Sequence, residues 1–309
     1  MVLGRVGLTG ATGMLGRHIR AALEAVEAQV VPVSHSGRDG TAQWDMAEWL
    51  TADALDALFG DVHAVVHAGA IVDSAAAGSE ARMFDVNVRA CANLAEWAVS
   101  RSSPLVFISS ASVYADPDSG HLSEDAPLGA NQLGGFYGMT KLMAEDILGR
   151  YRPRGLKLAV VRPSSLYGHG GPASKMLYKF LGLAARGETI DLTPPVDDRV
   201  DFLHAADFSS AVVGVLESAC WDTLNIASER PVSIRELALA CVEATGRGSV
   251  RVQEAEPLER LPLRRFFLDA TAARERLGWA SAIGIQQGLE MVLSGQLLAE
   301  QASLSDQTV

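Results

Sequence analysis

Short apolar runs alternate with longer segments of helical period through the first half of the chain. The apolar runs predict strands at Arg5–Thr9, Gln29–Ser34, Ala42–Trp44, Ala64–His67, Leu105–Ser109 and Leu158–Val161. The segments between them predict helices at Leu15–Ala28, Asp53–Phe59, Glu80–Ser100 and Phe136–Tyr151. This alternation is typical of parallel strands joined by crossover helices. We therefore predict an α/β fold built on a doubly wound parallel sheet.

The second half of the chain mixes helices with segments of loop composition at 164–172 and 193–199. Periodicity predicts helices at Met176–Arg186, Ile234–Thr245, Ala270–Leu277 and Ile285–Leu298. A short apolar run at Thr223–Ile226 predicts a strand that returns to the main sheet, so two domains should interleave. We assign residues 1–165 and about 200–227 to the sheet domain, 166–199 and 228–300 to a smaller C-terminal substrate domain, and 301–309 to a polar tail.

Composition excludes several classes of protein. The 309 residues carry a net charge of −11, and so acidic a surface repels nucleic acid. Three separated cysteines and seven histidines show no metal-ligand spacing, so we expect no metal and a reducing, cytoplasmic location. The chain shows neither a signal peptide nor the roughly 20 apolar residues of a membrane span, so we expect no membrane partner.

A glycine triplet, Gly10-x-x-Gly13-x-x-Gly16, follows the first strand and opens the first helix. In this context the first glycine makes a tight turn, the second lets a pyrophosphate approach the backbone, and the third lets helix and strand pack closely. Met14 and Leu15 lie on the same turn. The triplet predicts a dinucleotide site; the alternative is a purely structural turn.

Tyr137 and Lys141 are four residues apart in a predicted helix, which puts both on one face. A cation about 4 Å from a phenol favours the phenolate by about 4 kcal/mol at an effective dielectric of about 20, close to three pK units. We therefore expect Tyr137 to exchange a proton near neutral pH. Hydroxyl residues end the strand that begins at Leu105, and a serine there can hold a substrate oxygen beside Tyr137. The alternative for Tyr137 and Lys141 is that they are only a pair of residues on the surface of a helix. The alternative for the serines is that they only cap the end of the strand.

Together these residues resemble the extended short-chain dehydrogenase/reductases of the NAD(P)-dependent epimerase/dehydratase family, over nearly the whole chain. The motifs that carry the resemblance are Val66–Ala70, Val86–Val88, Ser109–Tyr114, Arg162–Gly168, Asp201–Asp207, Leu224–Ala227 and Leu277–Trp279. The resemblance implies a Rossmann-type sheet that binds NAD or NADP and a second domain that binds a small molecule, typically a nucleotide-sugar.

The resemblance also implies roles for particular residues. Ser110 matches the catalytic Ser/Thr, Tyr137 the proton carrier and Lys141 the lysine that binds ribose and activates the tyrosine. Cofactor-lining positions are Asp45, Met46, Ala68, Gly69, Ala70, Asn87, Pro163, Ser164 and Ser165. Substrate contacts are expected from Ser110, Ser112, Tyr137, Ser165 and Arg199.

Departures from the family pattern narrow the function. Dehydratases of the family place an Asp-Glu pair where this chain has Ala111 and Ser112, which disfavours the elimination of water. Ser165 stands where the family often has Asn, and the arginine that usually precedes Asp-Phe is displaced by one residue to Arg199. The nucleotide diphosphate of the substrate is therefore implied by the resemblance as a whole and not by these two positions.

The end of the second predicted strand bears on the choice of cofactor. NAD-binding folds place an acid there to hold the ribose 2′-hydroxyl, whereas this chain has Ser34, Ser36 and Arg38, which can donate to a 2′-phosphate. This favours NADP over NAD and net reduction over oxidation. A solvated loop indifferent to the phosphate is the alternative.

The leading hypothesis is a nucleotide-sugar ketoreductase. A nucleotide-sugar 4-epimerase is the alternative, and a non-catalytic nucleotide sensor is disfavoured because it needs neither Ser110, Tyr137 nor Lys141. In the resembled family the helices at Glu80–Ser100 and Phe136–Tyr151 commonly form a four-helix dimer interface, so we expect a homodimer. An apolar stripe should face the partner, made of Ala81, Phe84, Val88, Cys91, Ala92, Ala95 and Val99; the alternative is that it packs on its own sheet.

Overall fold

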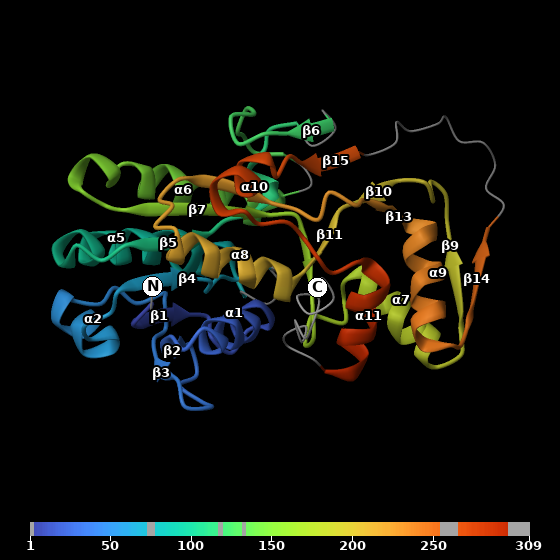
Figure 1. Ribbon diagram of the computed structural model, residues 1–309, viewed down its shortest axis with the longest axis horizontal. Helices are drawn as coiled ribbons and strands as arrows, with labels where there is room; N and C mark the ends of the chain where they lie inside the picture. The colour runs from blue at the N-terminus through green and yellow to red at the C-terminus, as the bar shows by residue number, and fades with distance from the viewer. Residues whose placement is uncertain (1–2, 73–77, 117–119, 132–133, 254–264, 296–309) are drawn as a thin grey trace, which may run out of the picture.

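A seven-stranded parallel sheet forms the centre of the molecule (Figure 1). The structure is a computed structural model and describes residues 3–72, 78–116, 120–131, 134–253 and 265–295. The strand order is β12-β7-β5-β4-β1-β2-β3. The strands are β1 (Arg5–Thr9), β2 (Gln29–Ser34), β3 (Ala42–Gln43), β4 (Ala64–His67), β5 (Leu105–Ile108), β7 (Leu158–Pro163) and β12 (Thr223–Ile226). The predicted doubly wound sheet is confirmed, because the order reverses about β1 and β4.

Helices cover both faces of this sheet. One face packs against α1 (Met14–Ala25), α8 (Ala205–Glu217) and α10 (Thr271–Leu277). The other packs against α2 (Ala52–Phe59), α5 (Ala90–Arg101) and α6 (Gly135–Gly149). Strands β1, β4 and β5 are covered on both sides, which explains why they read as continuous apolar runs rather than alternating ones.

The single helix predicted at Glu80–Ser100 is wrong in detail. The structure has α4 (Glu80–Phe84), a π-helical turn η1 (Asp85–Arg89) and then α5. The π turn buries three consecutive residues, Val86, Asn87 and Val88. A π turn inserts one residue into the helical repeat, so it shifts the face that later residues present. Simple 3.6-residue periodicity cannot anticipate this shift.

A smaller lobe lies beyond the carboxyl end of the sheet, on the right of Figure 1. Its apolar core joins α7 (Met176–Ala185), α9 (Ile234–Thr245) and α11 (Ile285–Ser294) to the parallel pair β9 (Thr189–Leu192) and β14 (Ser249–Val252). Helix α11 ends four residues before the predicted Leu298, and residues 296–309, including the predicted tail, lie outside the described residues.

Short strands that the sequence analysis missed connect the two lobes. Strand β8 (Ser165–Tyr167) pairs with β11 (Phe202–His204), although the segment 164–172 has loop composition. A second sheet has the order β13 (Val232–Ser233), β10 (Arg199–Val200), β15 (Arg265–Leu268) and β6 (Gly120–Leu122). Two 3₁₀ turns, η2 (Ala111–Val113) and η3 (Arg152–Arg154), complete the described elements. Most of these missed strands have only two or three residues, and such short runs show little periodicity.

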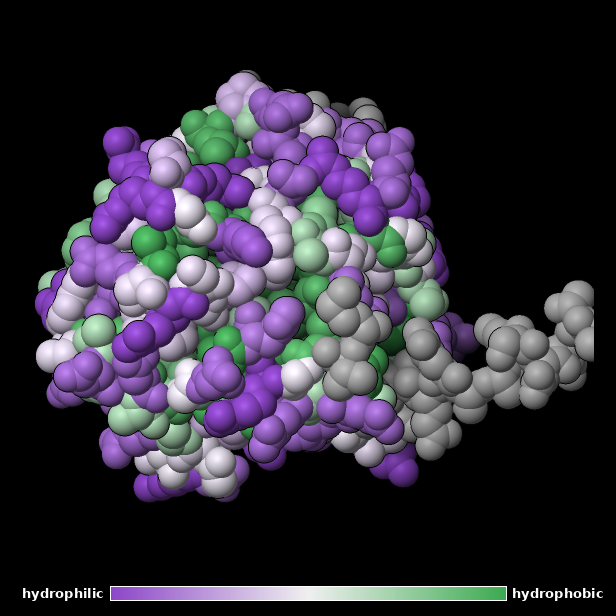
Figure 2. Space-filling view, turned by 60° about the vertical axis from the view of Figure 1, so that its left-hand side comes forward, coloured by the Kyte–Doolittle hydropathy of each residue, from purple (hydrophilic) through white to green (hydrophobic). Residues whose placement is uncertain are grey.

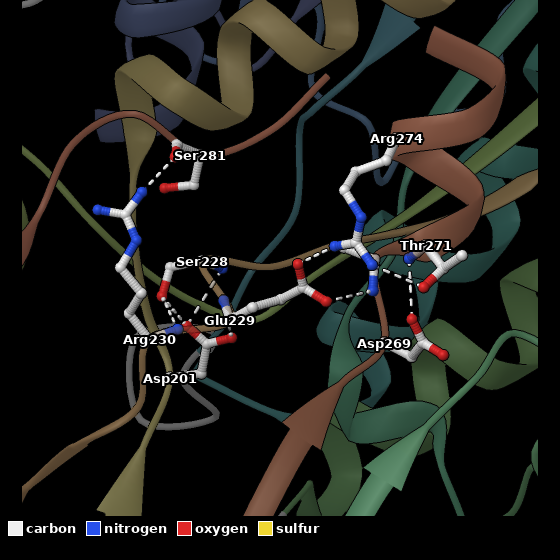
Figure 3. Close-up of polar contacts among 9 residues, drawn as sticks. Asp201, Ser228, Glu229, Arg230, Asp269, Thr271, Arg274 and Ser281 are labelled. Atoms are coloured by element: carbon white, nitrogen blue, oxygen red, sulfur yellow. Dashed lines mark hydrogen bonds and ion pairs between the residues drawn. The ribbon is translucent and has the colours of Figure 1, made fainter. Parts of the chain in front are cut away.

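Hydrogen bonds fix the loop after β12 at the junction between the two lobes (Figure 3). The buried Asp201 carboxylate accepts hydrogen bonds from the Ser228 hydroxyl and from the backbone N–H groups of Ser228 and Glu229. On either side, Glu229 pairs with Arg274 of α10 and Arg230 donates to the carbonyl of Ser281. Three chain segments that are distant in sequence are thereby held together where the second lobe begins.

The surface is mixed in character. Figure 2 shows a face on which hydrophilic residues predominate and hydrophobic ones form small, separate patches. In the described part of the chain, no helix combines the length and the apolar character needed to cross a membrane.

Candidate active site

The glycine triplet forms the turn between β1 and α1. Gly10 has a φ of +69°, and a Cβ there would lie 2.7 Å from the backbone of Gly69. A Cβ on Gly16 would lie 2.0 Å from the Gly10 carbonyl oxygen, so neither position admits a side chain. Gly13 caps α1 without any side-chain hydrogen bond, which leaves the first N–H groups of the helix uncovered by a side chain. These features fit the pyrophosphate of a dinucleotide.

The loop after β4 lies directly against this turn. The Gly69 N–H donates to the Thr9 hydroxyl (3.2 Å), which is also hydrogen-bonded to His67 Nδ1 (2.7 Å). A Cβ on Gly69 would meet the Met46 methyl group at 2.5 Å, so the structure brings these two predicted cofactor-lining residues together. Burial lowers the pKa of His67 to about 3, so the ring is neutral. Sequence reasoning missed Thr9, whose only signal is its place at the carboxyl end of β1.

Asp45 faces the side chains of Arg82 and His35. Arg82 donates to both of its carboxylate oxygens (3.0 and 3.2 Å), and His35 Nδ1 lies 3.7 Å away. Burial opposes the charge on Asp45, but hydrogen bonds from the Ala47 N–H and from Arg82 lower its pKa. Arg82, from α4, was not predicted as a site residue.

Hydrogen bonds of the Ser34 hydroxyl stabilise the loop after β2. The Thr41 hydroxyl donates to the Arg38 carbonyl (2.6 Å), so the Ser34 hydroxyl is the donor in its 2.6 Å contact with Thr41. Ser34 in turn accepts from the Gly37 N–H. The proton of Ser34 is therefore used within the loop, while Ser36 and Arg38 are exposed and face solvent.

Ser110, Ser112 and Tyr137 come together at the carboxyl end of β5. Ser110 precedes the turn η2 and accepts from the Ser112 N–H (3.2 Å). The hydroxyls of Ser110 and Ser112 are 2.8 Å apart, and Ser110 is near enough to Tyr137, on α6, to lower the pKa of its phenol against the effect of burial. The structure thus brings together three of the four hydroxyl residues that the sequence analysis assigned to the substrate.

The Lys141 ammonium is engaged away from the Tyr137 phenol in this structure. Burial raises the pKa of Tyr137 to about 12, opposed only by the nearby Ser110. The Lys141 ammonium instead donates to the carbonyl of Ile108 (2.7 Å) and lies over the Phe107 ring. The expectation of a lowered phenol pKa is therefore wrong for this arrangement, because the helical spacing fixes the face but not the direction of a long side chain. Burial lowers the pKa of Lys141 to about 8, while the nearby Cys91 and Glu145 raise it.

Asn87, in the π turn, ties the site to the loop after β4. Its side chain accepts from the Ile71 N–H and donates to the Ile71 carbonyl, both at 2.8 Å. It also donates to the Thr140 hydroxyl (3.0 Å), which donates to the carbonyl of Tyr137 (2.7 Å). Asn87 therefore connects a predicted cofactor-lining loop to the helix that carries Tyr137 and Lys141. Thr140 was not predicted.

A buried ion pair joins α6 to β7. Arg162 donates to both carboxylate oxygens of Glu145 (3.0 and 2.6 Å), and the two side chains are 4% and 8% exposed. Ser109 donates to the same carboxylate, and Arg162 reaches the Tyr114 hydroxyl (3.0 Å). Neither Glu145 nor Ser109 was assigned a role from sequence.

The residues after β7 lie close to the second lobe. The Ser165 N–H donates to the carbonyl of Asp201 (3.0 Å). Ser164 is buried, and within the described residues its hydroxyl has no hydrogen-bond partner, so it is free to bind a polar group of a cofactor or substrate. Arg199 is engaged elsewhere: it donates to the Pro231 carbonyl (2.8 Å) and pairs with Glu236 (3.2 Å). The structure therefore does not join Arg199 to the hydroxyl cluster.

Comparison with known proteins identifies the class. The sequence profile of the NAD dependent epimerase/dehydratase family matches residues 6–227, so the chain belongs to this family and is an enzyme rather than a nucleotide sensor. No group of three metal-ligating side chains occurs within the described ranges.

Individual relatives include nucleotide-sugar reductases, decarboxylases and epimerases. The dTDP-4-dehydro-6-deoxy-D-allose reductase of Streptomyces bikiniensis is 25% identical over 278 residues, covering 81% of this chain and 84% of that protein. The UDP-glucose 4-epimerase of Bacillus subtilis (strain 168) is 25% identical over 272 residues, covering 78% of each. The structure of MoeE5 in complex with UDP-glucuronic acid and NAD has a TM-score of 0.76 and 26% identity, covering 94% of this chain and 98% of that one.

Proposed function

We propose that this protein is a nucleotide-sugar ketoreductase that prefers NADPH. The observation that carries the proposal is the group of hydroxyls formed by Ser110, Ser112 and Tyr137 at the carboxyl end of β5. A phenol is protonated at neutral pH, and burial keeps Tyr137 in that form by raising its pKa. It therefore rests as a proton donor, which is the state that the reduction of a ketone requires.

The residues of the first lobe fit a dinucleotide. The turn from Gly10 to Gly16 and the uncovered start of α1 would hold the pyrophosphate, Asp45 and Met46 the adenosine half, and Ala68, Ala70 and Ser164 the nicotinamide half. A bound reduced nicotinamide supplies the hydride for the carbonyl carbon.

Residues of this chain then transfer the proton to the substrate. Tyr137 gives its phenol proton to the developing alkoxide, and Ser110 holds the same oxygen in place. Lys141, when charged, would stabilise the phenolate that remains once its ammonium turns from the Ile108 carbonyl towards Tyr137. The carboxyl end of the sheet and the second lobe, which we propose to comprise 166–199 and 228–300, would enclose the nucleotide-sugar.

The preference for NADPH rests on the loop after β2. This strand ends in Ser34 and not in a carboxylate, and the exposed Ser36 and Arg38 can donate to a 2′-phosphate. The expected dissociation constant for NADPH is below that for NADH, and Arg38→Ala should reduce the difference about tenfold, in line with the loss of one charge-assisted hydrogen bond. Equal affinities in the unaltered protein would favour the epimerase.

One assay separates the two reactions. The protein is incubated with a dTDP-linked 4-keto-6-deoxy sugar and either NADPH or NADH, and in parallel with UDP-glucose and NAD⁺. Stoichiometric loss of reduced cofactor with the keto sugar supports the ketoreductase. Formation of an epimer of UDP-glucose without net cofactor turnover overturns it in favour of the 4-epimerase. Tyr137→Phe is the inactive control for both.

Two further properties belong to this proposal. We propose a homodimer through α4, α5 and α6. We also propose a reducing, cytoplasmic setting, supported by the fact that Cys91, Cys220 and Cys241 are all free thiols.

A further inference from the structure

Two side chains of α6, one helical turn apart, connect this helix to the end of β5. The Lys141 ammonium donates to the Ile108 carbonyl (2.7 Å), and the Glu145 carboxylate accepts from the Ser109 hydroxyl. Ile108 is the last residue of β5, and Ser109 follows it directly. A spacing of four residues places Lys141 and Glu145 on one face of the helix. The same helical face therefore holds two neighbouring residues at the end of the strand.

These two connections lie next to the residues that would carry out the reaction. Ser110 follows Ser109 along the chain, and Tyr137 precedes Lys141 by one turn of α6. The distance between the Ser110 hydroxyl and the Tyr137 phenol thus depends on how firmly the end of β5 is held against α6. A displacement of about 1 Å among reacting groups can lower a rate about 100-fold. The contacts that fix the two elements to each other therefore bear directly on the reaction.

The two connections differ in what happens when a cofactor binds. In the mechanism proposed above, Lys141 gives up its bond to the strand when its ammonium turns towards the phenol. Glu145 stays in place, because Arg162 of β7 donates to both of its carboxylate oxygens (3.0 and 2.6 Å) and both side chains are buried. The Ser109 N–H donates to the Val161 carbonyl of β7 (2.8 Å), which holds the strand in the sheet but not against α6. The bond between Ser109 and Glu145 is therefore the connection that remains.

We propose that Ser109 and Glu145 are positioning residues, whose hydrogen bond keeps Ser110 in place beside Tyr137 while Lys141 is engaged with the cofactor. This inference rests on the ketoreductase proposed above, in which Lys141 changes its contact. The side chains of Ser109 and Glu145 are both buried, so the two residues act on the reaction through the strand and the helix that they join.

The first test needs no substrate. The N–H groups of Ser112 and Tyr114 bond within the turn η2, to the Ser110 hydroxyl and the Ala111 carbonyl, so their hydrogen exchange reports how firmly this turn is held. Exchange is measured by mass spectrometry for the peptide that contains the turn, without cofactor and with saturating NADP⁺. Compared with the unaltered protein, Ser109→Ala should exchange within about twofold without cofactor and about three- to tenfold faster with NADP⁺, because both connections are then missing.

The second test measures the effect on the reaction, with NADPH and a dTDP-linked 4-keto-6-deoxy sugar. Ser109→Ala should lower kcat about tenfold and change the KM for the sugar by less than about twofold, because the substrate still binds but its oxygen is misplaced relative to the proton donor. Ser109→Thr keeps the hydroxyl and should restore kcat to within about twofold. A purely structural role would lower the free energy of unfolding without this split between kcat and KM.

Ser103→Ala is the matched control. Ser103 is a buried serine near the start of β5, and within the described residues its hydroxyl has no hydrogen-bond partner. Its removal should leave both the exchange of the turn and kcat within about twofold of the unaltered protein. Equal effects in Ser103→Ala and Ser109→Ala would overturn the positioning role.

The outcomes separate this inference from the proposed function. If Ser109→Ala exchanges like the unaltered protein in both states, or is faster by the same factor in both, the positioning role is overturned. An unchanged kcat in Ser109→Ala would overturn it as well. If the unaltered protein reduces no keto sugar, the ketoreductase fails, and the exchange measurement still decides whether the bond between Ser109 and Glu145 holds the end of the strand in the cofactor complex.

Discussion

Tyr137 shows why a residue's type and spacing identify a site more readily than they identify its energetics. The spacing to Lys141 placed both on one helical face, and the structure agrees. Burial, however, raises the pKa of the phenol to about 12, and Lys141 is not among the groups that lower it. Burial depends on which residues pack around the side chain, and this cannot be predicted from the spacing of residues along the helix.

The first prediction concerns Tyr137 itself. Tyr137→Phe should lower kcat by about two to four orders of magnitude, because the proton donor is lost, while cofactor affinity changes little. Steady-state kinetics and cofactor titration by fluorescence provide the two measurements. Turnover near that of the unaltered protein would contradict the assigned role.

The second prediction concerns pH and Lys141. Burial lowers the pKa of Lys141 to about 8, below its ordinary value, so the side chain is charged below this pH and neutral above it. Since the charged form stabilises the phenolate, kcat/KM should fall as pH rises through about 8. Lys141→Met should be slower at neutral pH and should lack this alkaline limb. A limb that persists in Lys141→Met would assign it to another group.

At the scale of elements, regular segments were predictable and the irregular ones were not. Strands β1, β2, β4 and β12 have the predicted bounds because each is an apolar run between polar or glycine residues. The π turn Asp85–Arg89 was missed because its stability comes from tertiary contacts, namely the bonds of Asn87 to Ile71 and Thr140. The same holds for the buried Arg162–Glu145 pair, whose partners lie on β7 and α6.

The third prediction concerns that ion pair. Arg162→Met should lower the free energy of unfolding by about 3–5 kcal/mol, because it leaves the Glu145 carboxylate buried without its cation. The double variant Arg162→Met/Glu145→Met should recover part of this loss, since no buried charge then remains. Urea denaturation gives the free energies. Asp146→Asn, which breaks the exposed pair with Arg150 on the same helix, is the matched control and should change stability little.

At the scale of the whole molecule, the order of segments explains how the chain returns to its first lobe. The chain leaves the sheet after β7, builds part of the second lobe, and returns through α8 to β12, which pairs with β7. Thr223–Ile226 was predictable as a strand. The junction around Asp201 was not, because its partners Ser228 and Glu229 meet it only through this return.

The predicted dimer stripe is only partly available to a partner. Val88, Cys91 and Ala95 are buried in the molecule's own core, as the alternative interpretation held, because the π turn changes the face that α5 presents. Phe84 on α4 remains 40% exposed, and Met143 on α6 is 38% exposed. These two side chains are the apolar surface on which the predicted interface now depends.

The last prediction follows from this surface. A stable dimer buries about 800 Å² on each partner, and a charge placed within that area must be desolvated. Phe84→Glu and Met143→Glu should therefore each convert a dimer to a monomer at micromolar concentration, as measured by light scattering. Leu239→Glu is the matched control, because Leu239 is 52% exposed but lies on α9 of the second lobe, so the dimer should persist. A monomer in the unaltered protein would refute the interface altogether. A dimer that survives both substitutions on α4 and α6 would place the contact on another face.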